Sequence, residues 1–532
     1  MTKALYYGDN LEVLRESIAD ESIDLIYLDP PFNSNATYNV LFKSPTGSDA
    51  EAQIEAFEDT WHWGEQAERA FDEVLKSANT NAAELLRAMR SFLGESDMMA
   101  YLAMMAVRLL ELHRVLKPTG SLYLHCDPTA SHYLKLLLDG IFGAPNFRNE
   151  IVWRRSHPKG HAFTRFASNH DVILCHAKDI TQTRWNAIYN PHDPETAAQQ
   201  YSLTDENGRR YQLTSLLNPN PDRPNLTYEF KGVTKVWRWT RERMLEEDRK
   251  GRIVVPREGK GIPRYKRYLD EQEGIPVSDF WSDIGIAAGD ERLGYPTQKP
   301  IALLERIISA SSNANDLVLD PFCGCGTAVH AAEKLGRNWI GIDITCLAIG
   351  LIERRLKDAF PDIKFEVHGT PKALEDALDL AKRDKHQFQW WAVGLVDARP
   401  FAGKKKGADT GIDGIFYFSP DGKKTEKGIV SVKGGENIGV NAVRELHSVM
   451  EREKAPMGIL IEIALPTRTM EKEAAAVGMY ECEAGTFPRL QIITLAELFQ
   501  GRKPKLPLGR QAAATFKAAA REERAKQEKL DL

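Results

Sequence analysis

The chain has 532 residues, of which 42% are hydrophobic and 27% charged, and its formal net charge is −5. This length predicts roughly two to four domains, and the composition is ordinary for a water-soluble protein. No apolar run reaches the roughly 18 residues of a transmembrane helix, so no membrane span is expected. The small net charge neither favours nor opposes nucleic-acid binding, since a local basic face can act within an acidic whole.

The cysteines and the first residues predict a cellular compartment. The six cysteines are scattered without the spacing of a disulfide framework, and Cys323 and Cys325 have no second pair with which to hold zinc. Met1 is followed closely by a strand-like segment, residues 4–7, rather than by a signal peptide. We therefore expect a reduced, cytoplasmic setting.

The start of the chain alternates between strand and helix patterns. Residues 4–7 predict a strand, residues 11–18 a helix and residues 24–28 a buried strand. The buried strand leads directly into the motif Asp29-Pro30-Pro31-Phe32. Because such alternation is typical of a parallel sheet, the motif is expected where a parallel strand ends, which is where open α/β sheets place their chemistry.

A long polar segment, residues 34–95, separates this strand from the next regular elements. Residues 98–116 predict an amphipathic helix that ends at a turn over residues 117–120. Further strands are expected at residues 121–125, 151–153 and 171–175.

The sequence changes in character between residues 180 and 285, where Pro, Asn, Asp and Arg are frequent and no periodicity lasts. This predicts an irregular insertion that carries recognition loops. Cations cluster within and just before it, with Trp237 and Trp239 among them. They are Arg154, Arg155, His157, Lys159, His161 and Arg165; Lys231, Lys235, Arg238, Arg241 and Arg243; and Arg257, Lys260, Arg264, Lys266 and Arg267. Each one singly is better explained as a solvated residue, but together they suit phosphate contacts and base stacking.

A second motif, Asp320-Pro321-Phe322-Cys323-Gly324-Cys325-Gly326, joins a predicted strand at residues 317–319 to a predicted helix at residues 328–335. Its glycines let a backbone approach a cofactor closely. A dinucleotide site would want a third glycine further on, but Thr327-Ala328-Val329 follows, so a nicotinamide enzyme is not expected. The next strand, residues 339–342, ends in Asp343.

The two motifs in this order, with a variable segment between them, resemble an amino-methyltransferase of DNA of the beta class over roughly residues 1–370. Such enzymes methylate adenine N6 or cytosine N4. The resemblance implies a Rossmann-like α/β sheet, S-adenosylmethionine as cofactor and double-stranded DNA as partner. An RNA or protein-glutamine substrate stays open, and so does a DNA-binding module with vestigial catalysis, although intact Asp29, Gly324 and Gly326 count against the latter.

The resemblance also implies catalytic residues. The carboxylate of Asp29 and the carbonyl of Pro30 would accept hydrogen bonds from the target amine, and the prolines Pro30 and Pro31 would hold that carbonyl in place. Phe32 would stack on a base extruded from the duplex. The methyl group would move by direct displacement, without a metal. Asp rather than Ser at the head of the motif favours adenine N6 over cytosine N4.

The cofactor residues implied by the resemblance are Asp9, Thr297, Gln298, Lys299, Asp320, Phe322, Gly324, Gly326 and Asp343. In the family, the glycine turn and the counterpart of Asp320 lie near the methionine moiety. The counterpart of Asp343 binds the ribose hydroxyls, and that of Asp9 lies near the adenine amine. The counterparts of Thr297 to Lys299 lie on the methionine side.

Residues near 375–505 resemble an Mrr-type restriction endonuclease. The resemblance is carried by Gly407-Ala408-Asp409-Thr410-Gly411-Ile412-Asp413-Gly414, by a turn at Pro420-Asp421-Gly422 and by Gly428-Ile429-Val430-Ser431-Val432-Lys433, followed by a predicted helix at residues 443–450 and a strand at residues 458–461. Asp413 matches the first acid of that fold and Lys433 its lysine, which implies a Mg²⁺ site at Asp413. Ser431 stands where Glu, Asp or Gln is expected, and its hydroxyl is a weak ligand for Mg²⁺. Glu426 or Glu436 could substitute.

Three interpretations of this region stay open: an active nuclease that makes the chain a bifunctional restriction–modification enzyme, a nuclease relic that binds DNA or a partner, and an unrelated α/β domain. The sequence predicts methyltransferase halves at residues 1–179 and 286–370, a target-recognition insertion at residues 180–285, a restriction-endonuclease-like domain at residues 371–508, and a charged, helical or disordered tail at residues 509–532. The recognition sequence stays open, and so does the oligomeric state, with a homodimer among the alternatives.

Overall fold

The computed structural model describes residues 3–31, 37–41, 53–58, 62–157, 166–256, 261–293, 295, 297–401, 411–421, 425–435, 438–507 and 519–524. The residues divide into a main unit, Met1–Asn186 with Asp279–Leu532, and an insertion unit, Ala187–Ser278. Several residues of the sequence-based predictions lie outside the described residues: Phe32, Lys159, His161, Arg165, Arg257, Lys260 and Glu436. In the part of the chain that is described, no helix is long and apolar enough to cross a membrane.

A nine-stranded sheet runs through the main unit in the described residues, in the order β16-β6-β7-β5-β2-β17-β18-β1-β19. Its strands are β1 (Lys3–Tyr7), β2 (Ile23–Leu28), β5 (Leu116–Cys126), β6 (Phe147–Arg154), β7 (His170–Ala177), β16 (Phe280–Trp281), β17 (Leu317–Asp320), β18 (Asn338–Asp343) and β19 (Glu366–His368). The neighbours from β5 through β2, β17 and β18 to β1 are all parallel, whereas β7 is antiparallel to β5. The carboxyl ends of five adjacent strands therefore meet at one edge.

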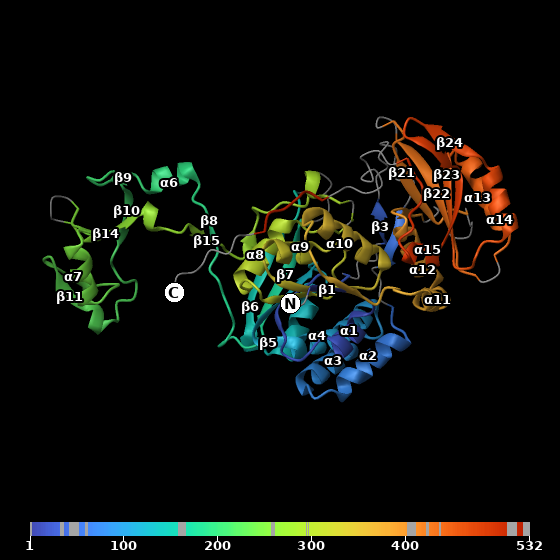
Figure 1. Cartoon of the computed structure of the whole chain (residues 1–532). Coiled ribbons are helices and arrows are strands. Elements are labelled where there is room, and N and C mark those ends of the chain that lie inside the picture. The colour runs from blue at the N-terminus through green and yellow to red at the C-terminus, as the bar shows by residue number, and fades with distance from the viewer. Residues whose placement is uncertain are drawn as a thin grey trace. The chain divides into compact units, whose positions relative to one another are not determined.

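Helices cover both faces of this sheet, which explains why β2 is buried at all six positions. Helices α8, α9 and α10 lie on one side of the sheet, and α1, α2, α3 and α4 lie on the other (Figure 1). Their bounds are α1 (Asn10–Ser17), α2 (Glu65–Lys76), α3 (Thr80–Leu93), α4 (Asp97–Val115), α5 (Ser131–Phe142), α8 (Ile301–Ser311), α9 (Thr327–Lys334) and α10 (Cys346–Ala359). A hairpin of β3 (Thr37–Leu41) and β4 (Gln53–Glu58) precedes α2.

Two local expectations differ from the structure. Helix α4 is buried around most of its surface rather than along one stripe, because α1, α2, α3 and α5 all pack against it. The turn expected at residues 117–120 does not end at a separate strand but lies within β5, as an irregularity where the register with β2 shifts between Ile23 and Leu25. Lys117 bonds the Asp24 carboxylate at 2.8 Å, and the backbone at Gly120 passes close to the carbonyl of Asp24, so Asp24 contacts both ends of this irregularity.

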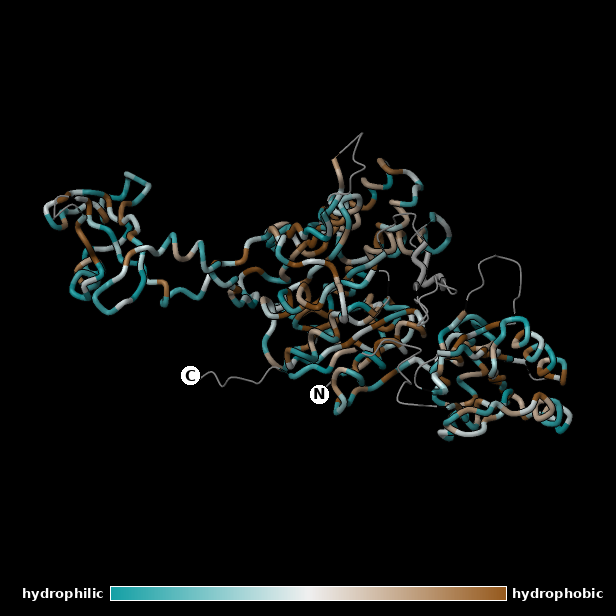
Figure 2. Tube along the Cα trace, turned by 90° about the horizontal axis from the view of Figure 1, so that it is seen from above, coloured by the Kyte–Doolittle hydropathy of each residue, from teal (hydrophilic) through white to brown (hydrophobic). Residues whose placement is uncertain are grey.

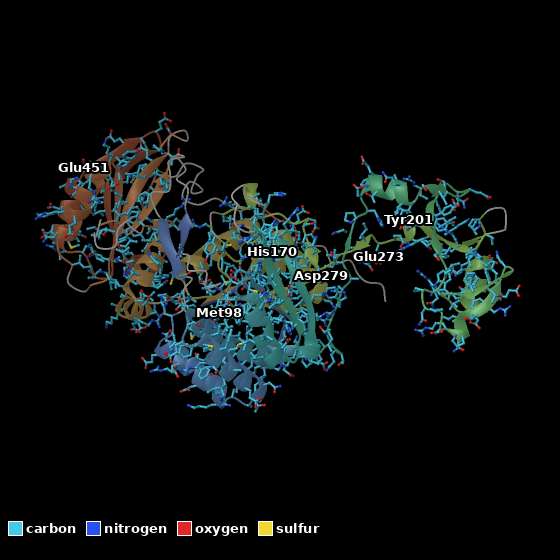
Figure 3. All side chains as sticks on the ribbon, turned by 180° about the vertical axis from the view of Figure 1, so that it is seen from behind. Met98, His170, Tyr201, Glu273, Asp279 and Glu451 are labelled. Atoms are coloured by element: carbon cyan, nitrogen blue, oxygen red, sulfur yellow. The ribbon has the colours of Figure 1, made fainter. Side chains whose placement is uncertain are left out.

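The insertion unit contains regular antiparallel structure where the sequence predicted irregular loops. Among its described residues, a four-stranded sheet has the order β13-β14-β10-β9 and packs with α7. The elements are β8 (Tyr189–Asn190), α6 (Pro194–Gln200), β9 (Leu203–Thr204), β10 (Arg210–Ser215), β11 (Thr227–Phe230), β12 (Val233–Val236), α7 (Arg241–Arg249), β13 (Ile253–Val254), β14 (Arg264–Tyr268) and β15 (Ile275–Pro276). Tyr201 and Glu273 of this unit are labelled in Figure 3. The short strands are separated by Asn-, Asp- and Gly-rich turns, which hid them in the sequence.

The C-terminal part of the main unit is an α/β domain with its own five-stranded sheet in the described residues, ordered β20-β21-β22-β23-β26. Its elements are α11 (Leu374–Arg383), α12 (Lys385–Leu395), β20 (Arg399–Pro400), β21 (Gly414–Phe418), β22 (Glu426–Lys433), α13 (Asn441–Arg452), β23 (Met457–Glu462), α14 (Arg468–Ala476), β24 (Met479–Cys482), β25 (Gly485–Pro488), β26 (Leu490–Thr494) and α15 (Leu495–Phe499). Helix α12 packs on one face of the sheet and α13 on the other. Hydrophobic and hydrophilic residues are interspersed along the trace of the chain (Figure 2), and Glu451 of α13 points outward (Figure 3).

The described part of the tail, residues 519–524, is neither helical nor separate from the main unit. Glu333 of α9 is fully buried and binds Lys3 at 2.6 Å and Arg524 at 2.7 Å. The amide of Glu522 also donates to the carbonyl of Ala359 at 3.0 Å. A buried carboxylate needs such cationic partners, and it holds this stretch of the tail in place.

Candidate active site

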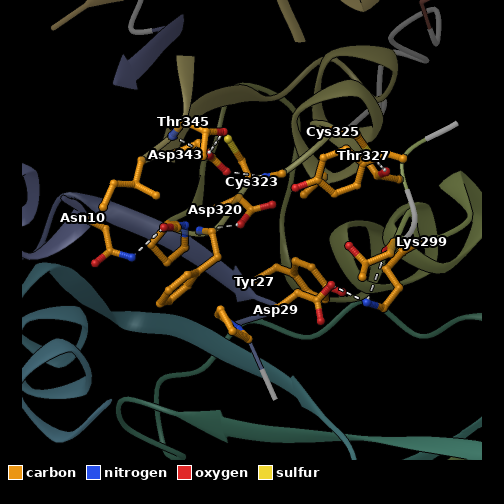
Figure 4. Close-up of a pocket in the computed structure, with 18 of the residues that line it drawn as sticks. Asn10, Tyr27, Asp29, Lys299, Asp320, Cys323, Cys325, Thr327, Asp343 and Thr345 are labelled. Carbon is orange, nitrogen blue, oxygen red and sulfur yellow. Dashed lines mark hydrogen bonds and ion pairs between the residues drawn. The ribbon is translucent and has the colours of Figure 1, made fainter. Parts of the chain in front are cut away.

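The two sequence motifs, almost three hundred residues apart, line one pocket. Asp29 follows β2, Asp320 ends β17 and Asp343 ends β18, so the parallel sheet brings the three carboxylates to the same edge. The pocket between them has a volume of about 260 Å³ and is lined by Asp29, Pro31 and the backbone and side chains of residues 320–325 (Figure 4). Its position at the carboxyl ends of parallel strands is where α/β sheets bind ligands.

Asp29 is held by a lysine. Lys299 forms an ion pair with Oδ2 of Asp29, and both side chains are largely buried, at 11% and 17% exposure. Lys299 also lies near the carbonyl oxygen of Thr297, and both residues line the pocket. The resemblance had placed Lys299 beside a cofactor, and the structure pairs it with the predicted catalytic acid. Because Lys299 contacts Oδ2, Oδ1 is left to accept a further hydrogen bond.

The glycine turn after β17 is tight at two positions. Gly324 and Gly326 have φ angles of 50° and 73°, in the left-handed region that favours glycine. A Cβ atom at Gly326 would lie 2.7 Å from Cγ1 of Ile352, and one at Gly324 would lie 3.3 Å from the ring of Tyr295. A side chain is therefore disfavoured by the backbone conformation at both positions, and at Gly326 it is also excluded by space.

Asp343 connects this turn to the end of β18 by hydrogen bonds. Its Oδ2 accepts a hydrogen bond from the amide of Gly324 at 2.9 Å, and its Oδ1 accepts from the amide and the hydroxyl of Thr345 at 2.9 Å and 2.8 Å. Burial raises the pKa of Asp343 despite these bonds. Carboxylate oxygens have several acceptor positions, so Asp343 shapes the turn and can still accept bonds from a ligand.

Asp320 is buried at the centre of the pocket. The amide of Phe322 donates to its Oδ1 at 3.1 Å. Burial raises the pKa of Asp320 well above its usual range, and the charges of Asp29 and Asp343 raise it further. A positively charged ligand would relieve this repulsion, so the lining suits a cation such as a sulfonium or an ammonium group.

Asp9 takes part in a network that the sequence analysis missed. Asp9 caps α1 by accepting from the amide of Leu11 at 2.8 Å, and it forms an ion pair with Arg108 at 3.0 Å. Arg108 also donates to Asn10 at 2.7 Å, and Asn10 donates to the carbonyl of Pro321 at 2.8 Å. The signal for Arg108 was present, as a charge inside the otherwise apolar middle of α4.

Gln298 is a predicted cofactor residue that does not line the pocket. Its side chain accepts from the amide of Leu293 at 2.8 Å and donates to the carbonyl of Glu291 at 2.7 Å. Gln298 thus braces the loop that carries Thr297 and Lys299. Pro30 and Gly326 are also set back from the lining, whereas Phe322 is part of it.

A row of buried polar side chains extends from the pocket across adjacent strands of the sheet. The hydroxyl of Tyr27 lies 2.9 Å from Nδ1 of His125, whose Nε2 lies 3.4 Å from Asp171. Arg155 lies 3.4 Å from the same carboxylate. Burial by itself would raise the pKa of Asp171. The hydrogen bond from His125 and the charge of Arg155 outweigh this effect and lower the pKa. Strand alternation alone could not show that these residues meet.

The predicted DNA-binding residues of the insertion unit differ in how far they are exposed to solvent. Trp237 is fully buried in its core, and its Nε1 donates to the carbonyl of Tyr228 at 2.8 Å, so it cannot stack on a base as expected. Trp239 packs edge-on against Tyr265, and the guanidinium of Arg243 lies 4.4 Å from the Trp239 ring centre. The exposed cations around these rings include Lys231, Lys235, Arg238, Arg241 and Arg243.

In the C-terminal domain Asp413, which directly precedes β21, contacts Ser431 and Val432 of the adjacent strand β22. The Oδ2 atom of Asp413 accepts from the amide of Val432 at 2.6 Å and from the hydroxyl of Ser431 at 3.3 Å. Lys433 lies 3.6 Å from Glu445 of α13. Glu426 begins β22, far along the strand from Lys433, and accepts from Tyr480, so it does not replace the missing acid. No group of three metal-binding side chains is found in the described residues.

Comparisons with known proteins assign a family to each of the two regions that contain these residues. Residues 23–353 match a family model described as DNA methylase, and residues 380–491 match one described as restriction endonuclease. The Type II methyltransferase M.EcaI of Enterobacter cloacae is 30% identical over 362 residues, which are 67% of this chain and 69% of that protein. DNA adenine methyltransferase YhdJ of Escherichia coli is 26% identical, over 66% of this chain and 82% of its own.

Two further similar proteins are a subunit of a restriction-modification enzyme and a protein of known structure. The Mod subunit of the Type III restriction-modification enzyme StyLTI of Salmonella typhimurium is 26% identical over 62% of this chain and half of its own length. Among solved structures, a DNA modification methylase of Thermus thermophilus in complex with S-adenosylmethionine is 15% identical, with a TM-score of 0.34 over 70% of this chain and 100% of that one.

The glycine turn yields a stability prediction. Replacing Gly326 by Ala should lower the free energy of unfolding by about 2 kcal/mol or more. The alanine would have to keep the left-handed backbone conformation of this position, and its Cβ would collide with Ile352. Urea denaturation measures the change. Gly350→Ala is the matched control, since its Cβ meets nothing within 4 Å inside α10. Equal midpoints for the two variants would contradict the tight packing of the turn.

Proposed function

Because the chain belongs to the DNA methylase family, we propose that it transfers a methyl group from S-adenosylmethionine to the N6 amine of adenine in double-stranded DNA. The proposal is carried by one observation: Asp29 and the start of the glycine turn, Gly324 and Cys325, line a single pocket. A family member that had lost its catalytic activity would not need to keep both Asp29 and the glycine turn.

The pocket fits S-adenosylmethionine by the chemistry of its lining. That cofactor carries a sulfonium and an ammonium group, and the pocket holds Asp29, Asp320 and Asp343. Bound there, it would supply an electrophilic methyl group. Asp343 is placed to accept bonds from ribose hydroxyls at the end of β18, and the turn at Gly324 lets the backbone approach the ligand closely.

The chain's own residues would prepare the amine. Its lone pair is delocalised into the base, and acceptors for its N–H bonds localise that lone pair and aim it. We assign this role to Oδ1 of Asp29, while Lys299 fixes the carboxylate through Oδ2. The family resemblance gives the carbonyl of Pro30 the same role, although Pro30 is set back from the pocket lining in this structure. Positioning of this kind carries most of the rate acceleration in such a transfer. Stacking by Phe32 stays a prediction.

Adenine is favoured over cytosine for two reasons. The motif begins with Asp, which in the family favours adenine N6. One similar protein is also a DNA adenine methyltransferase. The N4 amine of cytosine could use the same acceptors, so the modified base is the part of the proposal that the sequencing experiment below decides.

We assign DNA contact to the insertion unit. Its exposed cations Lys235, Arg238 and Arg241 suit phosphate groups, and Arg243 stacks on Trp239. Lys231 pairs with Asp248 and is therefore less available for phosphate.

A second activity is proposed for the C-terminal domain, which matches a restriction endonuclease model. Asp413 and Lys433 lie at the same end of two adjacent strands and on one face, as a metal-assisted hydrolase requires. This would make the chain a bifunctional restriction–modification enzyme.

The first test is chemical and genetic. DNA from cells that express the chain should carry N6-methyladenine in one sequence context, as read by long-read sequencing. Asp29→Ala should lower methyl transfer by about a hundredfold or more, because one acceptor for the amine is lost, while calorimetry shows S-adenosylmethionine binding largely kept. Asp20→Ala, an exposed acid before β2, is the control. Normal turnover by Asp29→Ala would show the site assignment to be wrong.

The second test separates two roles for Lys299. If it positions Asp29, Lys299→Met should lower kcat by about tenfold or more with a smaller change in KM for S-adenosylmethionine, and Lys299→Arg should restore part of kcat. A raised KM with an unchanged kcat would instead assign Lys299 to the cofactor.

The third test concerns DNA cleavage. Unmethylated plasmid should be cut in the presence of Mg²⁺ by the Asp29→Ala protein, and Lys433→Ala or Asp413→Ala in that background should abolish cutting. Lys427→Ala is the matched control, because this lysine lies on the same strand but pairs with Glu453. Cleavage that neither Lys433→Ala nor Asp413→Ala reduces would remove the nuclease hypothesis.

A further inference from the structure

The nuclease-like face of the C-terminal domain lacks one carboxylate at the expected position. Ser431 occupies that position, and its hydroxyl and the amide of Val432 both donate to Oδ2 of Asp413. Ser431 therefore orients Asp413, but a hydroxyl adds little to the binding of a hard cation. A working site needs a second acid from elsewhere in the fold.

Glu462 is on the same face of the sheet as Ser431 and Asp413. It ends β23 and is the register partner of Lys433 on the parallel neighbour β22. Side chains alternate between faces along a strand, so Glu462 shares a face with Leu460, as Lys433 shares one with Ile429. Both Leu460 and Ile429 belong to the core that packs against α13.

The carboxylate of Glu462 is buried without a compensating contact. It is 0% exposed, and neither of its oxygens has a hydrogen-bond partner among the described residues. Burial raises its pKa to about 7. An isolated buried carboxylate is unfavourable, and buried charges in proteins are normally paired or bind metal. The neighbouring cation, Lys433, lies instead 3.6 Å from Glu445.

We propose that Glu462 and Asp413 bind a divalent cation such as Mg²⁺, and that Glu462 supplies the carboxylate that position 431 lacks. The inference rests on the nuclease function proposed for this domain. Mg²⁺ is usually held by one or two protein carboxylates and keeps several waters, so two acids on one face fit this ion. A group of three acids is not required.

Other acids near Lys433 are weaker candidates. Glu445 is two-thirds exposed on α13 and is already paired with Lys433. Glu426 lies at the opposite end of β22, where it accepts from the hydroxyl of Tyr480. Neither is a buried carboxylate without a partner.

The proposal is tested by metal binding in the full-length protein, with Mn²⁺ as the probe in isothermal titration. Glu462→Gln keeps the shape of the side chain and removes its charge, and it should weaken Mn²⁺ binding at least tenfold. Asp413→Asn should do the same. Glu445→Gln is the matched control and should change binding less than twofold. Methyl transfer by each variant reports that the chain is folded.

A rescue variant sharpens the test. Ser431→Glu restores an acid at the ordinary position, so combining it with Glu462→Gln should recover Mn²⁺ binding and the Mn²⁺-dependent rise in melting temperature. Unchanged binding by Glu462→Gln, or loss of binding in Glu445→Gln instead, would overturn the role of Glu462.

The outcomes also separate this inference from the nuclease function. If the wild type cuts DNA and Glu462→Gln binds Mn²⁺ normally, the assignment of Glu462 fails and the nuclease function stands. If the wild type neither binds Mn²⁺ nor cuts DNA, both fail.

Discussion

The parallel pairing of β2, β17, β18 and β1 is the arrangement on which the candidate active site depends. Each of these strands leads to an acid at the same edge, although β2 and β17 are separated by almost three hundred residues. Three carboxylates held this closely repel one another, and Lys299 offsets part of that repulsion at Asp29. The sheet thus gathers acids in one pocket, and a positively charged ligand there would relieve their mutual repulsion.

Much of this architecture could be predicted because buried parallel strands are continuous apolar runs. The runs before Asp29, Asp320 and Asp343 correspond to β2, β17 and β18. What could not be predicted depends on partners distant in the chain. Arg108 meets Asp9 across about a hundred residues, and the irregularity at residues 117–120 of β5 is held by Asp24 of β2. Local pattern carries no information about such contacts.

The C-terminal domain shows the same limit. The helix and strand that follow Lys433 were predicted near their observed bounds, α13 and β23. The missing acid at Ser431 could be read from the sequence, but Glu462 could not be connected with it. That connection requires the register between β22 and β23, which pairs Glu462 with Lys433. Likewise, nothing local showed that Trp237 is a core residue of the insertion unit.

The position of β1 within the sheet has a consequence for synthesis of the protein. Both neighbours of this strand, β18 and β19, are made more than three hundred residues after it. Until then its backbone donors and acceptors are unpaired, and the apolar strand β2 also lacks its β17 neighbour. At translation speeds of about 5–20 residues per second, this interval lasts tens of seconds. Unpaired strand edges favour pairing with other chains, so this pairing order lengthens the time during which the nascent chain is exposed to aggregation.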